Sequence, residues 1–121
     1  MFLNTITETS GRAEIVLEWE MMGEDYIVTL KGGHEHIGAA AVGIYDDNKA
    51  ISTSSVISLP GHREEGIALE AARKISSFTH RTTVFMAGIH LDDITGEEID
   101  KIVEVSDIIV DRFIKYLEEN V

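Results

Sequence analysis

Cysteine is absent from this 121-residue chain, and proline occurs only once. The lack of cysteine excludes disulfides, thiolate nucleophiles and Cys-based zinc sites, so any metal site would need histidine and carboxylate ligands. No apolar run reaches the roughly 20 residues of a membrane span. The first residues also lack the basic and apolar regions of a signal peptide. We therefore expect a cytoplasmic protein that does not bind within a membrane.

Basic residues are scarce, with 10 lysines and arginines against 22 aspartates and glutamates and a formal net charge of −12. Nucleic acids and anionic membranes require clustered Lys and Arg, so both are poor partners for this chain. Hydrophobic residues make up 44% of the chain, which excludes a disordered protein. We predict a single domain over residues 1–121, in which residues 1–11 form a loosely ordered N-terminal segment.

Apolar periodicity predicts five strands and two helices. The strands are expected at residues 13–21, 26–30, 36–45, 51–59 and 82–89, with helices at residues 63–79 and from residue 95 onward. Thr95 with Glu98 three residues later forms a capping box, which marks the start of the last helix. The order β-β-β-β-α-β-α predicts an α+β fold, a mixed sheet of about five strands with two helices packed on one face.

Four of the five histidines lie in or beside glycine-containing junctions between these elements. The strand, helix and strand over residues 51–89 form a β-α-β unit, so its two strands run parallel and place His62 and His90 at one edge of the sheet. The preceding strand is antiparallel and starts at that edge, which adds His34 and His36. We therefore predict one site beyond the strand ends, where ligands commonly bind in sheets of this kind.

The residues alone leave the chemistry of this site open. His34, His36 and His90 with Asp92 supply nitrogen and oxygen ligands suitable for Zn, Fe or Mn, so a metal-dependent enzyme is one hypothesis. His90 with Asp92 or Asp93 is also a possible general acid–base pair, because histidine titrates near neutrality. No nucleophile motif accompanies these residues, and we assign no catalytic residue.

Anion binding is the third chemistry that the junctions allow. Gly61, His62 and Arg63 precede a helix whose first N–H groups attract phosphate or carboxylate. Gly38 would let the backbone approach a ligand closely.

A subunit contact is expected on the last helix, where Ile108 and Ile114 broaden the apolar stripe, so we also predict a homo-oligomer.

Three segments, residues 32–39, 54–63 and 87–93, occur in the same order in one known family. Over residues 25–120 the chain resembles the small D subunit of the non-oxidative hydroxyarylic acid decarboxylases, also described as a prenylated-flavin chaperone-like domain. Glu35 departs from the proline expected before the second histidine.

The resemblance implies a non-catalytic accessory role. The large subunit of those systems is a UbiD-type decarboxylase that uses prenylated FMN, and the D-type protein helps to mature or deliver that cofactor. We therefore expect a protein that binds a small anionic cofactor, prenylated FMN or FMN, for a UbiD-type partner. The expected cofactor-binding residues are His34, His36, Gly38, Gly61, His62, Arg63, His90 and Asp92.

Overall fold

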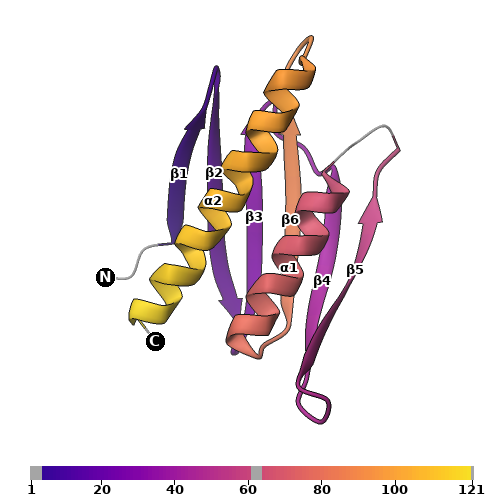
Figure 1. The fold of residues 1–121 in the computed structure, drawn as a ribbon, viewed down its shortest axis with the longest axis vertical. Helices are drawn as coiled ribbons and strands as arrows, with labels where there is room; N and C mark the ends of the chain where they lie inside the picture. Colours follow the sequence, from indigo (N-terminus) through magenta and orange to yellow (C-terminus); the bar gives the residue numbers. More distant parts are fainter. Residues whose placement is uncertain (1–3, 61–63, 121) are drawn as a thin grey trace.

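The computed structural model describes residues 4–60 and 64–120, which form one mixed β-sheet with two helices on one of its faces (Figure 1). The elements are β1 (Thr5–Ser10), β2 (Ala13–Met22), β3 (Asp25–Gly33), β4 (Ala39–Asp46), β5 (Ile51–Ser58), α1 (Glu65–Thr79), β6 (Thr83–His90) and α2 (Gly96–Asn120). The predicted α+β fold is confirmed, with six strands in place of about five. In the described part of the chain, neither helix combines the length and apolar content needed to cross a membrane.

The strand order in the sheet is β1-β2-β3-β6-β4-β5. β3 and β6 are parallel, whereas β4 is antiparallel to both of its neighbours, β5 and β6. β5 and β6 therefore run in the same direction, as predicted for the β-α-β unit, although β4 lies between them. As a result, the ends of β3, β5 and β6 and the beginning of β4 lie at one edge of the sheet.

The N-terminal segment is more regular than the sequence predicts. Thr5–Ser10 forms β1, which pairs antiparallel with β2 and places Thr5 opposite Glu18. Ile6 and Ser10 are buried. A loosely ordered segment over residues 1–11 is therefore wrong for residues 5–10. The segment holds a single large apolar residue among threonines, so its sequence shows too little periodicity to predict a strand. The strand forms because β2 supplies a pairing partner.

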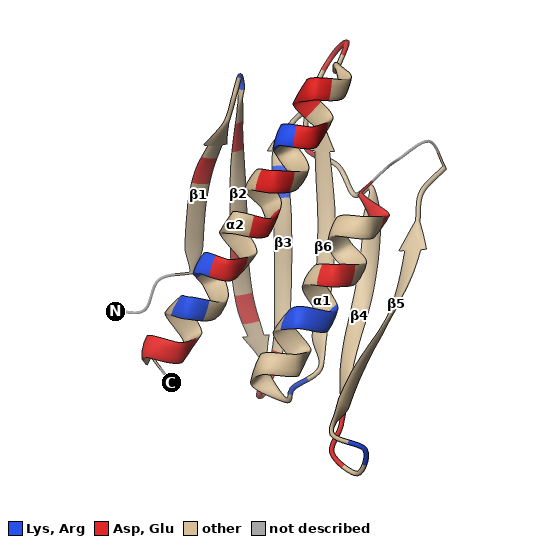
Figure 2. Cartoon of the chain, in the orientation of Figure 1, with Lys and Arg blue, Asp and Glu red and all other residues tan. Residues whose placement is uncertain are grey.

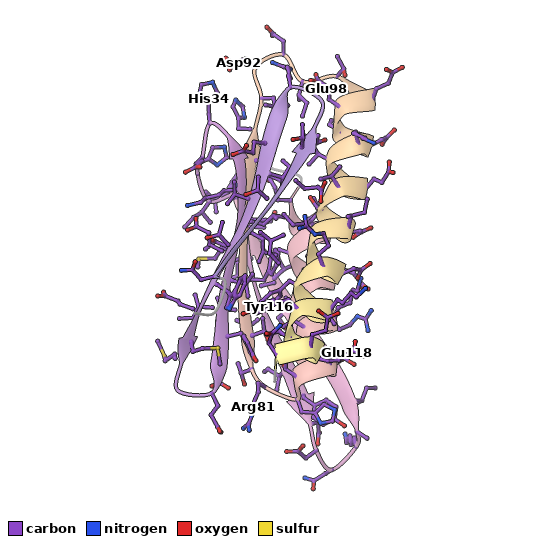
Figure 3. The ribbon with its side chains drawn as sticks, turned by 90° about the vertical axis from the view of Figure 1, so that its left-hand side faces the viewer. His34, Arg81, Asp92, Glu98, Tyr116 and Glu118 are labelled. Carbon is purple, nitrogen blue, oxygen red and sulfur yellow. The ribbon has the colours of Figure 1, made fainter. Side chains whose placement is uncertain are left out.

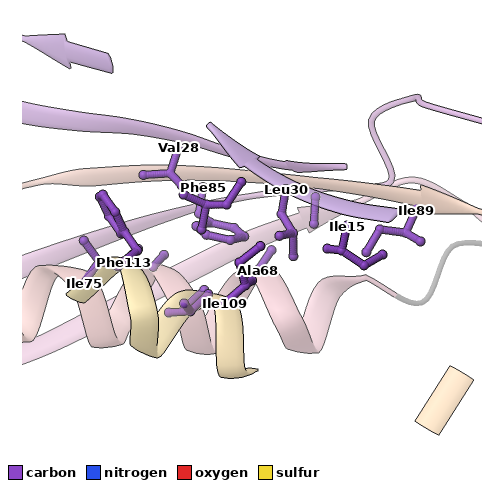
Figure 4. Close-up of a cluster of buried hydrophobic side chains, with 14 of the residues drawn as sticks. Ile15, Val28, Leu30, Ala68, Ile75, Phe85, Ile89, Ile109 and Phe113 are labelled. Atoms are coloured by element: carbon purple, nitrogen blue, oxygen red, sulfur yellow. The ribbon is translucent and has the colours of Figure 1, made fainter. Parts of the chain in front are cut away.

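The hydrophobic core lies between the sheet and the two helices (Figure 4). Val28, Leu30 and Phe85 from the sheet and Ile75 and Phe113 from the helices are fully buried. Burial of side chains of this size is worth about 1.5–3 kcal/mol each. The core therefore fixes the helices on the sheet and thereby sets the positions of the loops at its ends.

α1 lies very close to β4 because the facing side chains are small. Ala68 and Ala72 on the helix face Ala39 and Ala41 on the strand, and all four are fully buried. A Cβ added at Gly43 would overlap the carbonyl oxygen of Ala72. Both helices cover the same face of the sheet, and no described element covers the other, which we call the open face (Figure 3).

Candidate functional site at the histidine edge

His34, His36, His90 and Asp92, here called the histidine edge, gather where β3 and β6 end. Gly33 lies opposite His90 in the parallel β3–β6 ladder, and the His34 N–H donates to the His90 carbonyl oxygen over 2.9 Å. The ring centroid of His90 is 6.1 Å from that of His34 and 5.5 Å from that of His36. Residues far apart in the sequence are thus brought together, as strand direction predicts.

The Asp92 carboxylate lies beside two of these imidazoles. One of its oxygens is 3.3 Å from His34 Nε2, and the other is 3.9 Å from His90 Nε2. The His34 and Asp92 side chains are 71% and 73% exposed, and both lie at the same end of the molecule (Figure 3). Polar contacts between side chains as exposed as these contribute little to stability, so these groups are available to a ligand.

Gly88 positions the segment that carries His36. A Cβ at residue 88 would overlap the His36 carbonyl oxygen and lie 2.5 Å from the His36 carbonyl carbon. Nearby, the Gly38 N–H donates to the carbonyl oxygen of Ala87 over 2.9 Å. The backbone of this segment therefore lies directly against the end of β6, and a side chain on Gly88 would prevent this approach.

Glu64, which the sequence places in the first turn of the helix after residues 61–63, is a buried carboxylate in this region. Its Oε1 accepts a hydrogen bond from the Ile89 N–H over 3.4 Å. A Cβ at Gly38 would overlap Glu64 Oε2, so this side chain occupies the space beside Gly38 that the sequence assigns to a ligand. Glu64 is also the N-cap residue of α1, where a negative side chain already interacts favourably with the helix dipole.

The predicted anion site at Gly61, His62 and Arg63 lies outside the described residues. Its contribution to the histidine edge therefore stays a prediction from sequence. What the structure does place is the end of β5 before this segment and the start of α1 after it, both on the side of the sheet where β6 ends.

Arg12, in the turn between β1 and β2, holds the loop that carries Asp92. Its Nη2 donates to the Asp92 carbonyl oxygen over 2.6 Å, and its Nε donates to Glu98 Oε2 over 2.6 Å. The predicted capping box is present, since Glu98 N–H donates to Thr95 Oγ1 and Thr95 N–H donates back to Glu98 Oε1, both over 3.1 Å. Arg12 could not be found from sequence because its partners are 80 and 86 residues away.

Replacing Arg12 with alanine is expected to raise the pKa of Glu98. The hydrogen bond from Arg12, followed by that from the Thr95 backbone, lowers the pKa of Glu98 from 4.5 to about 2. The lowered pKa means that this ion pair stabilises the fold above pH 4.5 and that the stabilisation is lost as the pH falls toward 2. In an NMR titration of Arg12→Ala, the Glu98 midpoint should move toward 4.5 but stop short of it, because Thr95 still donates.

Arg112→Ala is the matched control for this titration. Arg112 pairs with Glu8 and also donates to the Thr7 carbonyl oxygen, which lie away from Glu98. The Glu98 midpoint should therefore stay near 2 in this variant. An unchanged midpoint in Arg12→Ala would show that Arg12 does not hold the loop as described.

An apolar pocket of about 420 Å³ lies beside the histidine edge, between the end of β6 and the first turns of the two helices. Ile67, Ile89 and Ile99 are among its aliphatic walls, and Glu64 and His90 are its ionisable members. This volume lies within the range of about 300–1,000 Å³ typical of small-molecule sites. His90 belongs both to this pocket and to the histidine edge.

A metal centre is not formed by the side chains that the structure describes. Among residues 4–60 and 64–120, no group of three or more His, Asp or Glu side chains is arranged to hold a metal ion. His34, His36, His90 and Asp92, the predicted ligands of a metal-dependent enzyme, come close in space without forming a coordination site. The geometry therefore gives no support to the metal hypothesis.

Residues 9–118 match the family described as the prenylated flavin chaperone LpdD-like domain. This match places the chain in a class of accessory chaperone domains, and it spans nearly the whole of the described fold. The chain belongs to the prenylated flavin chaperone LpdD-like family, which confirms the predicted resemblance.

No curated protein matches this chain. Among solved structures, it is similar to a chain in the crystal structure of a novel chaperone complex for yeast 20S proteasome assembly. The two share 12% sequence identity with a TM-score of 0.58, and the match covers 93% of this chain and 96% of that one. At this level of identity the likeness shows a shared fold and nothing about ligands or partners.

Proposed function

We propose that this protein is a non-catalytic accessory protein that binds prenylated FMN at the histidine edge and serves the maturation of a UbiD-type decarboxylase. The observation that carries this proposal is the meeting of His34, His36 and His90 at one exposed edge, next to an apolar pocket. Membership of a prenylated flavin chaperone family supports the class of ligand.

The two parts of the site suit the two parts of such a ligand. Prenylated FMN combines a phosphate with an extended ring system whose dimethylbenzene and prenyl-derived parts are apolar. Imidazole N–H groups donate hydrogen bonds to phosphate oxygens, and these hydrogen bonds are stronger when the imidazole is protonated. The aliphatic walls of the neighbouring pocket suit apolar ring atoms. Because the chain carries a net charge of −12, such local donors are needed to hold an anion.

The exposure of the histidine edge suits a protein that passes its ligand on. A delivered cofactor has to be held where a second protein can reach it, and the His34, His90 and Asp92 side chains are all at least half exposed. The acidic residues concentrate on α2 and on the neighbouring strands (Figure 2). A partner enzyme with a basic surface would be attracted to this side by its charge.

Loss of two histidines is expected to weaken prenylated FMN binding at least tenfold. Each tenfold change corresponds to about 1.4 kcal/mol, which is the cost of losing one or two good hydrogen bonds. The variant is His34→Asn with His90→Asn, and binding is measured by titrating FMN and prenylated FMN while following flavin fluorescence. His62→Ala tests the sequence-predicted anion site in the same assay.

His80, the one histidine that lies outside the glycine-containing junctions, provides the control. His80 caps the C-terminus of α1 with a left-handed backbone (φ 59°) that asparagine also tolerates, and its ring stacks on Tyr45. His80→Asn should therefore bind prenylated FMN like the wild type. The proposal fails if the wild type binds neither flavin, or if the double variant binds prenylated FMN as tightly as the wild type.

A further inference from the structure

The two outermost strands of the sheet, β1 and β5, differ in how well their outward backbone groups are protected from pairing with another strand. β5 forms one edge and pairs only with β4. Leu59 N–H donates to the Gly38 carbonyl oxygen over 2.8 Å, in register with the β4–β5 ladder. Because backbone groups alternate in direction along an antiparallel strand, those of Ser52, Ser54 and Val56 point away from the sheet. They form a row of donors and acceptors ready to pair with another strand.

Among residues 4–60 and 64–120, β5 has none of the features that normally block such pairing. Its eight residues, ISTSSVIS, include no charged residue and no proline. Natural edge strands are usually protected by lysine, proline, a bulge or a covering element. β1, the other outermost strand, is protected by a side chain from α2 that covers it. Arg112 donates to the outward Thr7 carbonyl oxygen over 3.1 Å and pairs with Glu8 over 2.6 Å.

Apolar side chains are exposed along the same edge. On the open face, Ile51 is 53% exposed and Ile57 is 78% exposed, and the neighbouring strand adds Val42 at 39% and Ile44 at 51%. In a chain with a net charge of −12, β4, β5 and β6 are almost free of charge, which is concentrated instead on the helices, on β1 and β2 and in the turns (Figure 2).

We infer that β5 pairs antiparallel with β5 of a second copy of this chain, so that one sheet continues across two subunits. A twofold axis at Ser54, perpendicular to the sheet, places Ser52 opposite Val56 and Ile51 opposite Ile57 of the other copy. The outward backbone groups then face each other, and the two largest exposed side chains meet on the open face. Each such cross-strand pair adds roughly 0.2–1 kcal/mol.

The charge distribution selects a second copy over an unrelated partner. Two copies with a charge of −12 each repel wherever the carboxylates of one copy approach those of the other. β5 itself carries no carboxylate, so two β5 strands can meet without this repulsion. A different protein attracted by charge would instead dock on the carboxylates of α2. The sequence predicts a subunit contact at Ile108 and Ile114 on α2, where Ile108 is 43% exposed and Ile114 packs against the core. β5 offers both unpaired backbone groups and exposed apolar side chains, so we place the contact between copies there.

The test is Thr53→Lys combined with Ser55→Lys. In the inferred register these two residues lie opposite each other across the twofold axis, so the variant places like charges face to face in the pair. Sedimentation equilibrium should give the wild type twice the 13.4 kDa chain mass and give the variant a single chain mass. The control is Thr7→Lys with Thr9→Lys, which adds the same charge to exposed positions on β1 and should leave the wild-type mass unchanged.

Amide hydrogen exchange gives a second measurement that needs no variant. Pairing of two β5 strands should slow exchange at the Ser52, Ser54 and Val56 amides as the protein concentration rises, whereas an open edge exchanges freely. A wild type of single chain mass at all concentrations, a β5 variant that keeps the doubled mass, or unprotected amides at these residues would each overturn the inference.

Discussion

Replacing Gly88 with alanine is expected to lower the free energy of unfolding by about 2–4 kcal/mol and to displace the segment that carries His36. The new methyl group would overlap the His36 carbonyl oxygen. A flexible side chain could rotate away from such a contact, but the atoms here are backbone on both sides. Relief therefore requires the segment to move, which breaks the hydrogen bond from Gly38 N–H to the Ala87 carbonyl oxygen.

The matched control is the same substitution at Gly66. This residue lies in α1, and a Cβ added there meets no atom within 4 Å. Alanine favours a helix over glycine by up to about 1 kcal/mol, so Gly66→Ala should be neutral or stabilising. Urea unfolding measures both variants, and amide NMR shifts of His36 and Gly38 report the displacement. A Gly88→Ala protein with wild-type stability and unchanged shifts would contradict the described packing.

Phe113→Ala is expected to cost about 3–5 kcal/mol, a large part of the roughly 5–15 kcal/mol that stabilises a domain of this kind. The Phe113 ring is fully buried, and its centroid lies 4.7 Å from that of Trp19 and 6.2 Å from that of Tyr26. Its removal leaves a cavity between α2 and the sheet that the rigid strands cannot fill. Urea unfolding gives the loss, and Trp19 fluorescence reports the change beside the ring.

Phe78→Ala separates the effect of burial from that of the substitution. Phe78 is on α1 and is 43% exposed, so its loss should cost about 1 kcal/mol or less. Equal losses in the two variants would mean that Phe113 is not the centre of the core. In both proteins the flavin titration should be made well below the unfolding transition, so that weakened binding is not confused with unfolding.

Much of the candidate site follows from the order and direction of the elements. The β-α-β unit places His90 at the edge where the preceding antiparallel strand, next to His34, begins, and the ring centroids of His34 and His90 are 6.1 Å apart. The capping box at Thr95 and Glu98 is also predicted, since both partners lie within one helical turn. Such features depend on neighbours in sequence or on the parallel direction of two strands joined by one helix, and both can be judged without knowing the rest of the fold.

Other features of the site depend on contacts between distant segments. Sequence alone does not show that Arg12 holds the Asp92 loop, that the His36 backbone lies against Gly88, or that Glu64 occupies the space beside Gly38. It also treats residues 5–10 as loosely ordered, although they pair with β2. Each of these contacts depends on how closely two backbones approach, which the packing of the whole core decides.

Local patterns in the sequence are enough to predict the α+β class, the direction of the strands and the gathering of three histidines at one edge. These follow from apolar periodicity, turn residues and the type of connection between successive strands, which act over short stretches of chain. The folded arrangement is needed to show which groups surround the histidines, where the apolar pocket opens and which edge strand is left unprotected. Those properties depend on the fit between segments as far as 86 residues apart, as between Arg12 and Glu98, and no local pattern encodes that fit.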